Sequence, residues 1–355
     1  MTHPALHTSA CDLFGVRYPI VQTGMGWVAG ARLTSATSAA GALGILASAT
    51  MTYDQLEDAI HEVQGRTDQP FGVNLRADRD DVDQRIDMLV RERVRVASFA
   101  QAPGERLVKR LRDAGVVTMP TVGAPRHAEK VAAWGVDALI AQGAEGGGHT
   151  GTIPTSLLLP AVVDAVDIPV LAAGGFTDGR GLVAALAWGA AGVAMGTRFL
   201  LTKESTVPDT VKDVYVGTPV TGTVVTKRID GYPQRVIRTG VVERLEHSGR
   251  LTALPRALRN ALAFRKLTGT SLRALVREGL AMKRKEGLTW SQVAMGANAP
   301  MLTKATMVDG RLETGILPTG QGVGVIDELP TVADLVTRII DEAEQTLTRL
   351  EKGGA

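Results

Sequence analysis

The chain has 355 residues, of which 45% are hydrophobic and 21% are charged, a composition typical of a globular protein with a large core. Its net charge of +2 gives no argument for nucleic-acid binding, and the single cysteine, Cys11, excludes an internal disulfide. The N-terminal residues lack the pattern of a secretory signal, and every apolar run is interrupted well before the roughly 20 residues that span a bilayer. We therefore expect a cytoplasmic protein that binds neither nucleic acid nor membranes.

Eight short apolar segments follow one another along the chain, each followed by a turn and a helical pattern. Their starts lie 21 to 32 residues apart, which is the length of a strand plus one crossover helix. Several lack polar alternation, as expected for parallel strands covered on both faces. Eight such units predict an α/β protein with a (β/α)₈ TIM barrel. The predicted strands are Pro19–Thr23, Leu43–Ala47, Phe71–Asn74, Val96–Phe99, Val117–Pro120, Ala138–Ala141, Val170–Ala173 and Gly192–Met195.

Helical patterns fill the intervals between these strands, as crossover connections require. Their apolar residues recur at helical spacing, so each helix is expected to pack one face on the barrel. The predicted helices are Ala31–Ala40, Gln55–Val63, Gln84–Glu92, Glu105–Ala114, Arg126–Trp134, Leu159–Val166 and Gly181–Trp188.

The chain beyond Val207 is not needed to close a barrel. Residues Arg256–Lys285 are rich in Leu, Ala and Arg and predict helices, and Val332–Glu351 carries apolar residues at near-helical spacing. A glycine-rich loop, Gly315–Gly324, precedes that last helix. We predict a barrel built from residues 11–215 and 312–355, with a smaller, mainly helical cap or lid over residues 216–311.

Charge is unevenly distributed in the predicted cap. Between Lys227 and Lys285 there are fifteen lysine or arginine residues against four acidic ones. One interpretation is a solvated basic helix face. The other is a binding site for an anionic ligand, such as the phosphates of coenzyme A or of a dinucleotide.

The loop after the first strand reads Gly24-Met25-Gly26-Trp27-Val28-Ala29-Gly30. Its glycine spacing differs from the dinucleotide-binding fingerprint, and the second strand ends at Ala47-Ser48 without the acidic residue that holds a ribose. We therefore reject a Rossmann domain and expect backbone that approaches a flat cofactor ring closely. For Gly30 alone, a tight turn is the better explanation.

Two further glycine loops follow the seventh and eighth strands. They contain Gly174-Gly175 and Met195-Gly196-Thr197. In (β/α)₈ enzymes, the loops at these positions often bind phosphate through bare backbone N–H groups and a helix N-terminus. We expect Asp178, in the first of them, to be a helix N-cap, because an anion there would repel phosphate.

The loop after the sixth strand, Gln142 to Gly151, contains four glycines followed by His149. Because its neighbours lack side chains that would bury it, His149 can face a ligand and act as general acid or base near neutral pH. The alternative is a structural or solvated histidine. Glu145 either assists His149 or is solvated. No Cys/His cluster predicts a metal site, and no nucleophile-elbow or P-loop motif occurs.

Carboxamide side chains end two of the predicted strands. Asn74 ends the third strand and Gln142 the sixth. A carboxamide both donates and accepts hydrogen bonds, which suits a flavin ring or a phosphate. Each of these residues is weak evidence taken alone.

Together these motifs resemble the nitronate monooxygenase-like (2-nitropropane dioxygenase-like) family of FMN barrels, which includes NAD(P)H:quinone reductases and FMN-dependent enoyl reductases. The resemblance implies FMN as cofactor and places His149 over the flavin, where it handles a substrate proton. It implies that FMN is held by Gly24, Met25, Asn74, Gln142, Gly147, Gly175, Gly196 and Thr197. The matching segments are Gln22–Met25, Phe71–Asn74, Gln142–Gly151, Ala172–Gly175 and Met195–Thr197.

Further segments resemble a branch of this family that acts on a CoA thioester from steroid catabolism. They include Phe71–Asp78, Arg95–Phe99, Leu288–Val293 and Ala297–Leu302. That branch implies an acyl-CoA-like substrate, a C=C bond introduced next to the thioester or reduced there, and NAD(H) as electron partner. A homo-oligomer is compatible with the sequence.

Three other functions remain open at this point. Two belong to the same family: oxidation of a nitronate such as propionate 3-nitronate, and NAD(P)H:quinone reduction. Gly146 stands where nitronate oxidisers commonly have alanine, which weakens the first of these. The third is not enzymatic: a flavin-free barrel that binds a phosphometabolite. All share one fold, so the fold cannot separate them.

Overall fold

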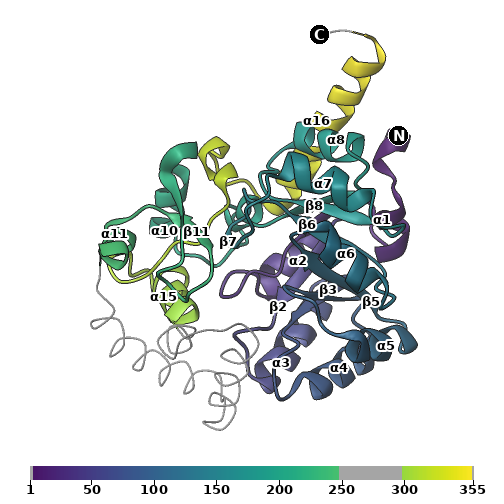
Figure 1. The fold of residues 1–355 in the computed structure, drawn as a ribbon, viewed down its shortest axis with the longest axis horizontal. Coiled ribbons are helices and arrows are strands. Elements are labelled where there is room, and N and C mark those ends of the chain that lie inside the picture. The colour runs from purple at the N-terminus through teal and green to yellow at the C-terminus, as the bar shows by residue number, and fades with distance from the viewer. Residues whose placement is uncertain (1–2, 248–297, 354–355) are drawn as a thin grey trace.

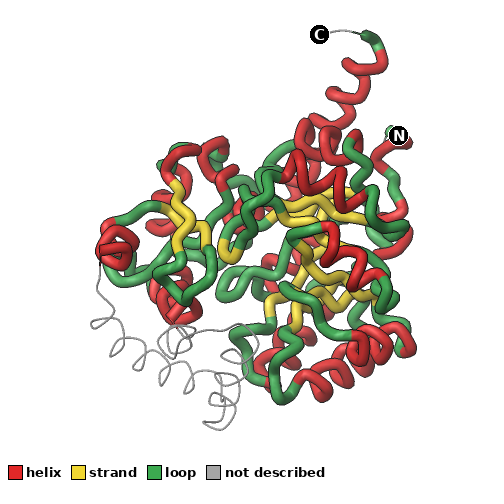
Figure 2. The backbone as a smooth tube through the Cα atoms, in the orientation of Figure 1, coloured by secondary structure: helices red, strands yellow, loops and turns green. Residues whose placement is uncertain are grey.

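The computed structural model describes residues 3–247 and 298–353. Eight parallel strands close into a barrel in the order β1-β2-β3-β4-β5-β6-β8-β9, seen on the right of Figure 2. Every predicted strand is confirmed, with each end within two residues of its expected position. The barrel strands are β1 (Ile20–Gln22), β2 (Leu43–Ala47), β3 (Phe71–Leu75), β4 (Val96–Phe99), β5 (Val117–Val122), β6 (Leu139–Gln142), β8 (Val170–Ala173) and β9 (Gly192–Met195).

Helices surround this barrel on its outer face (Figure 1). They are α2 (Ala31–Ala39), α3 (Tyr53–Gln64), α4 (Val82–Arg91), α5 (Glu105–Asp113), α6 (Pro125–Ala132), α7 (Thr155–Val163) and α8 (Gly179–Ala187). All seven predicted helices are present, but α7 begins at Thr155 instead of Leu159. The prediction placed Pro160 in the first turn, where proline is favoured. In the structure the Glu145 carboxylate accepts a hydrogen bond from the Thr155 backbone N–H, so the helix begins a turn earlier.

The inside of the barrel is filled by apolar side chains. Its buried cluster includes Val21, Leu43, Ile45, Val96, Val117, Met119, Ile140 and Leu171. Ala10 and Phe14 of helix α1 (Ser9–Phe14) belong to the same cluster. This short helix, preceded by a single 3₁₀ turn over Pro4–Leu6, packs onto the barrel interior. The carboxyl ends of the strands lie at the other end of the barrel from this helix. In (β/α)₈ enzymes that end carries the active site.

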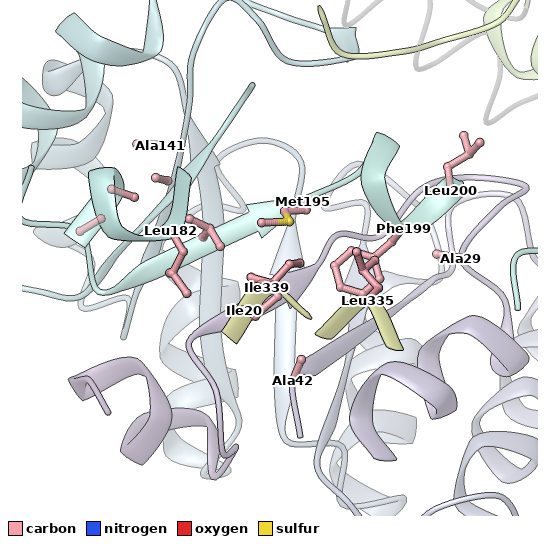
Figure 3. Packing of buried hydrophobic residues seen from close by; sticks show 14 of the residues in the cluster. Ile20, Ala29, Ala42, Ala141, Leu182, Met195, Phe199, Leu200, Leu335 and Ile339 are labelled. Carbon is pink, nitrogen blue, oxygen red and sulfur yellow. The ribbon is translucent and has the colours of Figure 1, made fainter. Parts of the chain in front are cut away.

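The C-terminal helix α16 (Val332–Glu351) is confirmed with the predicted bounds and returns to the barrel. Figure 3 shows Leu335 and Ile339 of this helix in one buried cluster with Ile20 of β1 and Phe199. The backbones of α8 and α16 nearly touch, since a Cβ on Gly179 would lie 2.3 Å from the Ile339 carbonyl oxygen. Figure 1 shows the two helices side by side.

A smaller unit lies beside the barrel, on the left of Figure 1. We call its strands β10 (Thr223–Thr226) and β11 (Gln234–Ile237) and its helices α11 (Gly240–His247) and α15 (Asn298–Met307) the cap. It has its own buried cluster, which includes Ile229, Val236, Val242, Leu302 and Ile316. The helices expected over 256–285 lie outside the described residues, and the bounds 216–311 stay a prediction.

The cap contains a small antiparallel sheet that sequence analysis did not predict. Strand β11 pairs with β10 on one side and with β7 (Gly148–His149) on the other. Strand β7 lies in the histidine loop, so this sheet joins the loop directly to the cap. The remaining elements are α9 (Thr197–Leu200), α10 (Asp209–Val216) and the 3₁₀ turns over Val220–Gly222 and Gln321–Val325. Over residues 3–247 and 298–353, no helix has the length and apolar character to cross a membrane.

Gly44 tests the contact between β2 and α2. A Cβ at this position would lie 2.2 Å from the Thr34 carbonyl oxygen, and neither buried backbone has room to move. We expect Gly44→Ala to lower the free energy of unfolding by about 3 kcal/mol or more, seen as a lower urea midpoint. Gly123→Ala is the control, because a Cβ there meets nothing within 4 Å, and it should change stability by less than about 0.5 kcal/mol. Equal stability of the two variants would contradict this packing.

Candidate active site

The predicted cofactor residues lie at one end of the barrel, because the carboxyl ends of parallel strands all meet there. A Cβ on Gly24, after β1, would lie 2.5 Å from the Asn74 Cβ of β3. A Cβ on Gly196, after β9, would lie 3.5 Å from the Met25 sulfur. Met195 is the last residue of β9 and is buried. The loops after β1 and β9 and the end of β3 therefore meet at one rim.

The loop after β8 lies against the histidine loop. A Cβ on Gly174 would lie 3.2 Å from the Gly146 backbone nitrogen, and one on Gly175 would lie 3.6 Å from the Glu145 Cβ. Gly174 and Gly175 have φ angles of +102° and +86°, a region that glycine adopts without strain. Asp178 accepts a hydrogen bond from the Gly181 N–H at 2.9 Å, which confirms it as the N-cap of α8.

The glycine-rich loop 315–324 reaches the same rim. The Gly320 N–H donates to the Thr197 hydroxyl at 2.9 Å, and the Gln321 N–H donates to the Glu145 carbonyl at 2.8 Å. A Cβ on Gly147 would lie 2.5 Å from the Gly320 nitrogen. Sequence analysis identified this loop by its glycine content but gave it no place at the site.

Both predicted carboxamide side chains, Asn74 and Gln142, donate hydrogen bonds to neighbouring groups of the rim. Gln142 donates from Nε2 to the His149 carbonyl at 2.8 Å, and Asn74 donates from Nδ2 to the Ser98 hydroxyl at 3.0 Å. Over the described ranges, the amide oxygens of these two side chains have no hydrogen-bond partner. Those oxygens are the acceptors that the rim can offer to a ligand.

His149 lies on β7, between the barrel rim and the cap. Its Nε2 is 2.7 Å from Oδ2 of Asp230, whose side chain is 5% exposed, whereas the imidazole is 60% exposed. The Tyr232 ring meets the imidazole edge to face, with 5.9 Å between ring centroids. Sequence analysis identified His149 but missed Asp230, which is 81 residues further along the chain. No motif marks it.

Two charged side chains hold the histidine loop in place. Glu145 accepts from the Thr155 N–H at 2.9 Å and from its hydroxyl at 2.7 Å, so this half-buried carboxylate holds the start of α7. A part for it beside His149 stays a prediction. Arg235 donates to the Ala144 carbonyl at 3.0 and 3.2 Å and to the Thr223 hydroxyl at 2.9 Å. Burial lowers the pKa of the Arg235 guanidinium and the charge of Glu145 opposes this. The loop is therefore anchored from both the barrel and the cap.

The rim suits a ligand that combines a phosphate with a flat ring. The loops after β8 and β9 contain Gly174, Gly175 and Gly196, and proteins commonly bind phosphate through the backbone N–H groups of such glycine loops. The amide oxygens of Asn74 and Gln142 are acceptors for ring N–H groups. Within residues 3–247 and 298–353, no group of three His, Cys, Asp or Glu side chains is placed to hold a metal ion.

The position of this rim, at the carboxyl ends of the strands and with an imidazole beside it, places the protein among the (β/α)₈-barrel enzymes. The chain belongs to the nitronate monooxygenase family, whose model matches residues 7–85 and 81–342. It is accordingly an oxidoreductase.

Two curated relatives are similar over nearly their whole length. Both are named (3aS,4S,5R,7aS)-5-hydroxy-7a-methyl-1-oxo-octahydro-1H-indene-4-carboxyl-CoA dehydrogenase. The protein of Rhodococcus jostii (strain RHA1) is 57% identical over 345 residues, which are 97% of this chain and 98% of the relative. That of Mycobacterium tuberculosis (strain ATCC 25618 / H37Rv) is 56% identical over 353 residues, 99% of each chain. Among solved structures, FabK from Thermotoga maritima has 33% identity and a TM-score of 0.78, covering 98% of this chain and 99% of its own.

Thr197 tests the rim. Its hydroxyl is the acceptor for the Gly320 N–H, so Thr197→Val removes the contact that holds the loop 315–324 at the rim. We expect the affinity for FMN to fall about tenfold, measured by quenching of FMN fluorescence. Thr34→Val is the matched control, because the Thr34 hydroxyl is buried and has no hydrogen-bond partner among the described residues. FMN binding in Thr197→Val as tight as in the control would refute the proposed position of the phosphate.

Proposed function

We propose that the protein is an FMN-dependent dehydrogenase of a CoA thioester from the breakdown of steroid C and D rings, with His149 as the proton-transfer residue. The observation that carries this proposal is the exposed imidazole of His149, which stands beside a glycine-lined rim able to bind a phosphate and a flat ring. The CoA substrate class is supported by the names of two relatives that are 56–57% identical over almost the whole chain.

The rim residues have distinct tasks in this proposal. The loops containing Gly174-Gly175 and Gly196-Thr197 hold the FMN phosphate through backbone N–H groups. The amide groups of Asn74 and Gln142 would hydrogen-bond the polar edge of the ring, and the backbone at Gly24, Met25, Gly147 and Met195 would lie against it. FMN, once bound, supplies the hydride acceptor, and NAD⁺ finally takes the electron pair.

The chemistry of a thioester defines what His149 must do. The thioester carbonyl acidifies the proton on the α carbon, and the neutral imidazole removes it. Loss of that proton and of a hydride from the β carbon leaves a C=C bond conjugated with the thioester. In the reverse direction the imidazolium returns the proton. His149 therefore serves in both directions.

Three parts of the proposal rest on the sequence alone. The structure describes the basic segment only from Lys227 to His247, and residues 248–285 lie outside the described ranges. Within the described part, Arg235 already bonds the Ala144 carbonyl and the Thr223 hydroxyl. Binding of the CoA phosphates by this segment, NAD(H) as electron partner and homo-oligomer formation stay predictions.

An anaerobic titration tests the function. We expect stepwise addition of the indene-carboxyl-CoA to the purified yellow protein to bleach the flavin absorbance, because the substrate transfers its hydride to the bound FMN. Added NAD⁺ should then restore the colour. Absence of bleaching at saturating thioester would reject the assignment.

His149→Ala should retain FMN and lose about 10²-fold or more in kcat, a loss typical of removing a general base. Bound FMN is measured by absorbance, and turnover by NADH formation. His61→Ala is the control, because His61 is exposed on α3 and pairs with Glu92 away from the rim. Full activity in His149→Ala would show that the histidine has no part in proton transfer.

Nitronate oxidation is the second candidate, because the matching family model carries that name. Oxygen uptake with propionate 3-nitronate that does not depend on NADH would select it.

Rapid flavin reduction by NADH with turnover on benzoquinone would select quinone reduction. A colourless protein that takes up no added FMN would favour the phosphometabolite-binding barrel.

A further inference from the structure

The carboxylate of Asp230 is buried beside an imidazole that is mostly exposed, and the proposed function leaves this carboxylate without a task. We propose that Asp230 is the positioning residue of the site: it holds the proton of neutral His149 on Nε2, so that Nδ1 is the atom that exchanges a proton with substrate. This inference rests on the proposed function only for the identity of the substrate. The hydrogen-bond pattern itself belongs to the protein.

In the hydrogen bond between His149 and Asp230 the imidazole is the donor. Nε2 of His149 and Oδ2 of Asp230 are 2.7 Å apart, within the range of a strong hydrogen bond. An ionised carboxylate only accepts hydrogen bonds, so the proton between the two atoms is carried by the imidazole. Neutral imidazole has one N–H, and this contact places it on Nε2.

Hydrogen-bond donors surround the Asp230 carboxylate. Its buried side chain accepts three hydrogen bonds: from His149, from the Tyr232 backbone N–H at 3.1 Å to Oδ1, and from the Gln234 amide to Oδ2. All three partners are donors, which matches a carboxylate that offers only acceptor oxygens. The Nε2 atoms of Gln234 and His149 also lie 3.1 Å apart, because both N–H groups converge on the same carboxylate oxygen.

The backbone pairing of β7 with β11 brings His149 and Gln234 together. His149 and Gln234 are directly opposite each other in the antiparallel pair of β7 and β11. Opposite residues project to the same face, so the two side chains start side by side. Asp230 lies four residues before Gln234, and its Oδ1 bonds the backbone of Tyr232, which fixes the turn that presents the carboxylate.

The consequence is a defined role for each ring nitrogen. With Nε2 engaged by Asp230, Nδ1 carries the lone pair, and among the residues that the structure describes it has no hydrogen-bond partner. A substrate proton taken by Nδ1 leaves an imidazolium whose charge faces the Asp230 carboxylate. Orienting the ring and stabilising its charged form is the established task of a carboxylate behind a catalytic histidine.

Nitrogen-15 NMR on protein labelled at histidine tests the geometry without any substrate. We expect neutral His149 to show Nε2 protonated and Nδ1 unprotonated, with a slowly exchanging ring N–H proton that is absent from His149→Ala. In Asp230→Asn three donors compete for one amide oxygen, so this slowly exchanging signal should be lost. A proton on Nδ1 of neutral His149 in the wild-type protein, or an unchanged signal in Asp230→Asn, would overturn the proposal.

Steady-state kinetics provide the second readout. Asp230→Asn should lower kcat about 10²-fold while KM changes less than about threefold and FMN stays bound, because the carboxylate acts on proton transfer and not on binding. Asp83→Asn, which removes an exposed aspartate on α4, is the matched control and should keep wild-type kinetics. Wild-type kcat in folded Asp230→Asn would overturn the positioning role. A negative thioester titration together with the expected NMR signal would instead reject the proposed function and leave the positioning role standing.

Discussion

The pairing of β7 with β11 is the contact on which the arrangement of the site depends. It comprises only two register pairs, His149 with Gln234 and Gly148 with Arg235. Because successive side chains of a strand point to opposite faces, this one pairing directs Gln234 toward the imidazole and Arg235 away from it. The Arg235 guanidinium reaches back to the Ala144 carbonyl on the other face. A single short piece of sheet thus fixes both the backbone of the histidine loop and the surroundings of its side chain.

The glycines of that loop have a second physical reason beside access for a ligand. A Cβ on Gly143 would lie 2.1 Å from the Thr155 hydroxyl, one on Gly146 2.7 Å from the Gln142 amide nitrogen, and one on Gly147 2.5 Å from Gly320. The histidine loop packs closely against β6, α7 and the loop before α16. Sequence analysis attributed these glycines to an open surface around His149. The structure shows that Gly143, Gly146 and Gly147 are required for close packing, whereas a Cβ on Gly148 or Gly151 would meet no described atom closer than 4.0 Å.

The sequence predicted those parts of the fold and the site that depend on a local residue pattern. The barrel strands are continuous buried runs separated by one helix length, so all eight were found, and the rim residues follow because they lie directly after those strands. Asp230 and Gly320 reach the rim from distant segments and have no spacing rule that relates them to His149. Strand β7 has two residues and β11 has four, too few to show an alternation of polar and apolar residues.

The candidate site is divided between the barrel and the cap. The barrel loops provide the predicted cofactor rim, whereas the cap supports His149 through the pairing of β11 with β7. A second contact joins the two parts: the Trp27 indole N–H donates to the Pro300 carbonyl of α15 at 2.9 Å. Trp27 has φ of +66°, a conformation that costs a bulky residue energy and persists only where surrounding contacts enforce it. Because Trp27 directly follows the Met25-Gly26 segment of the rim, this contact links the loop after β1 to the cap. The loop after β1 and the histidine loop are therefore both tied to the cap.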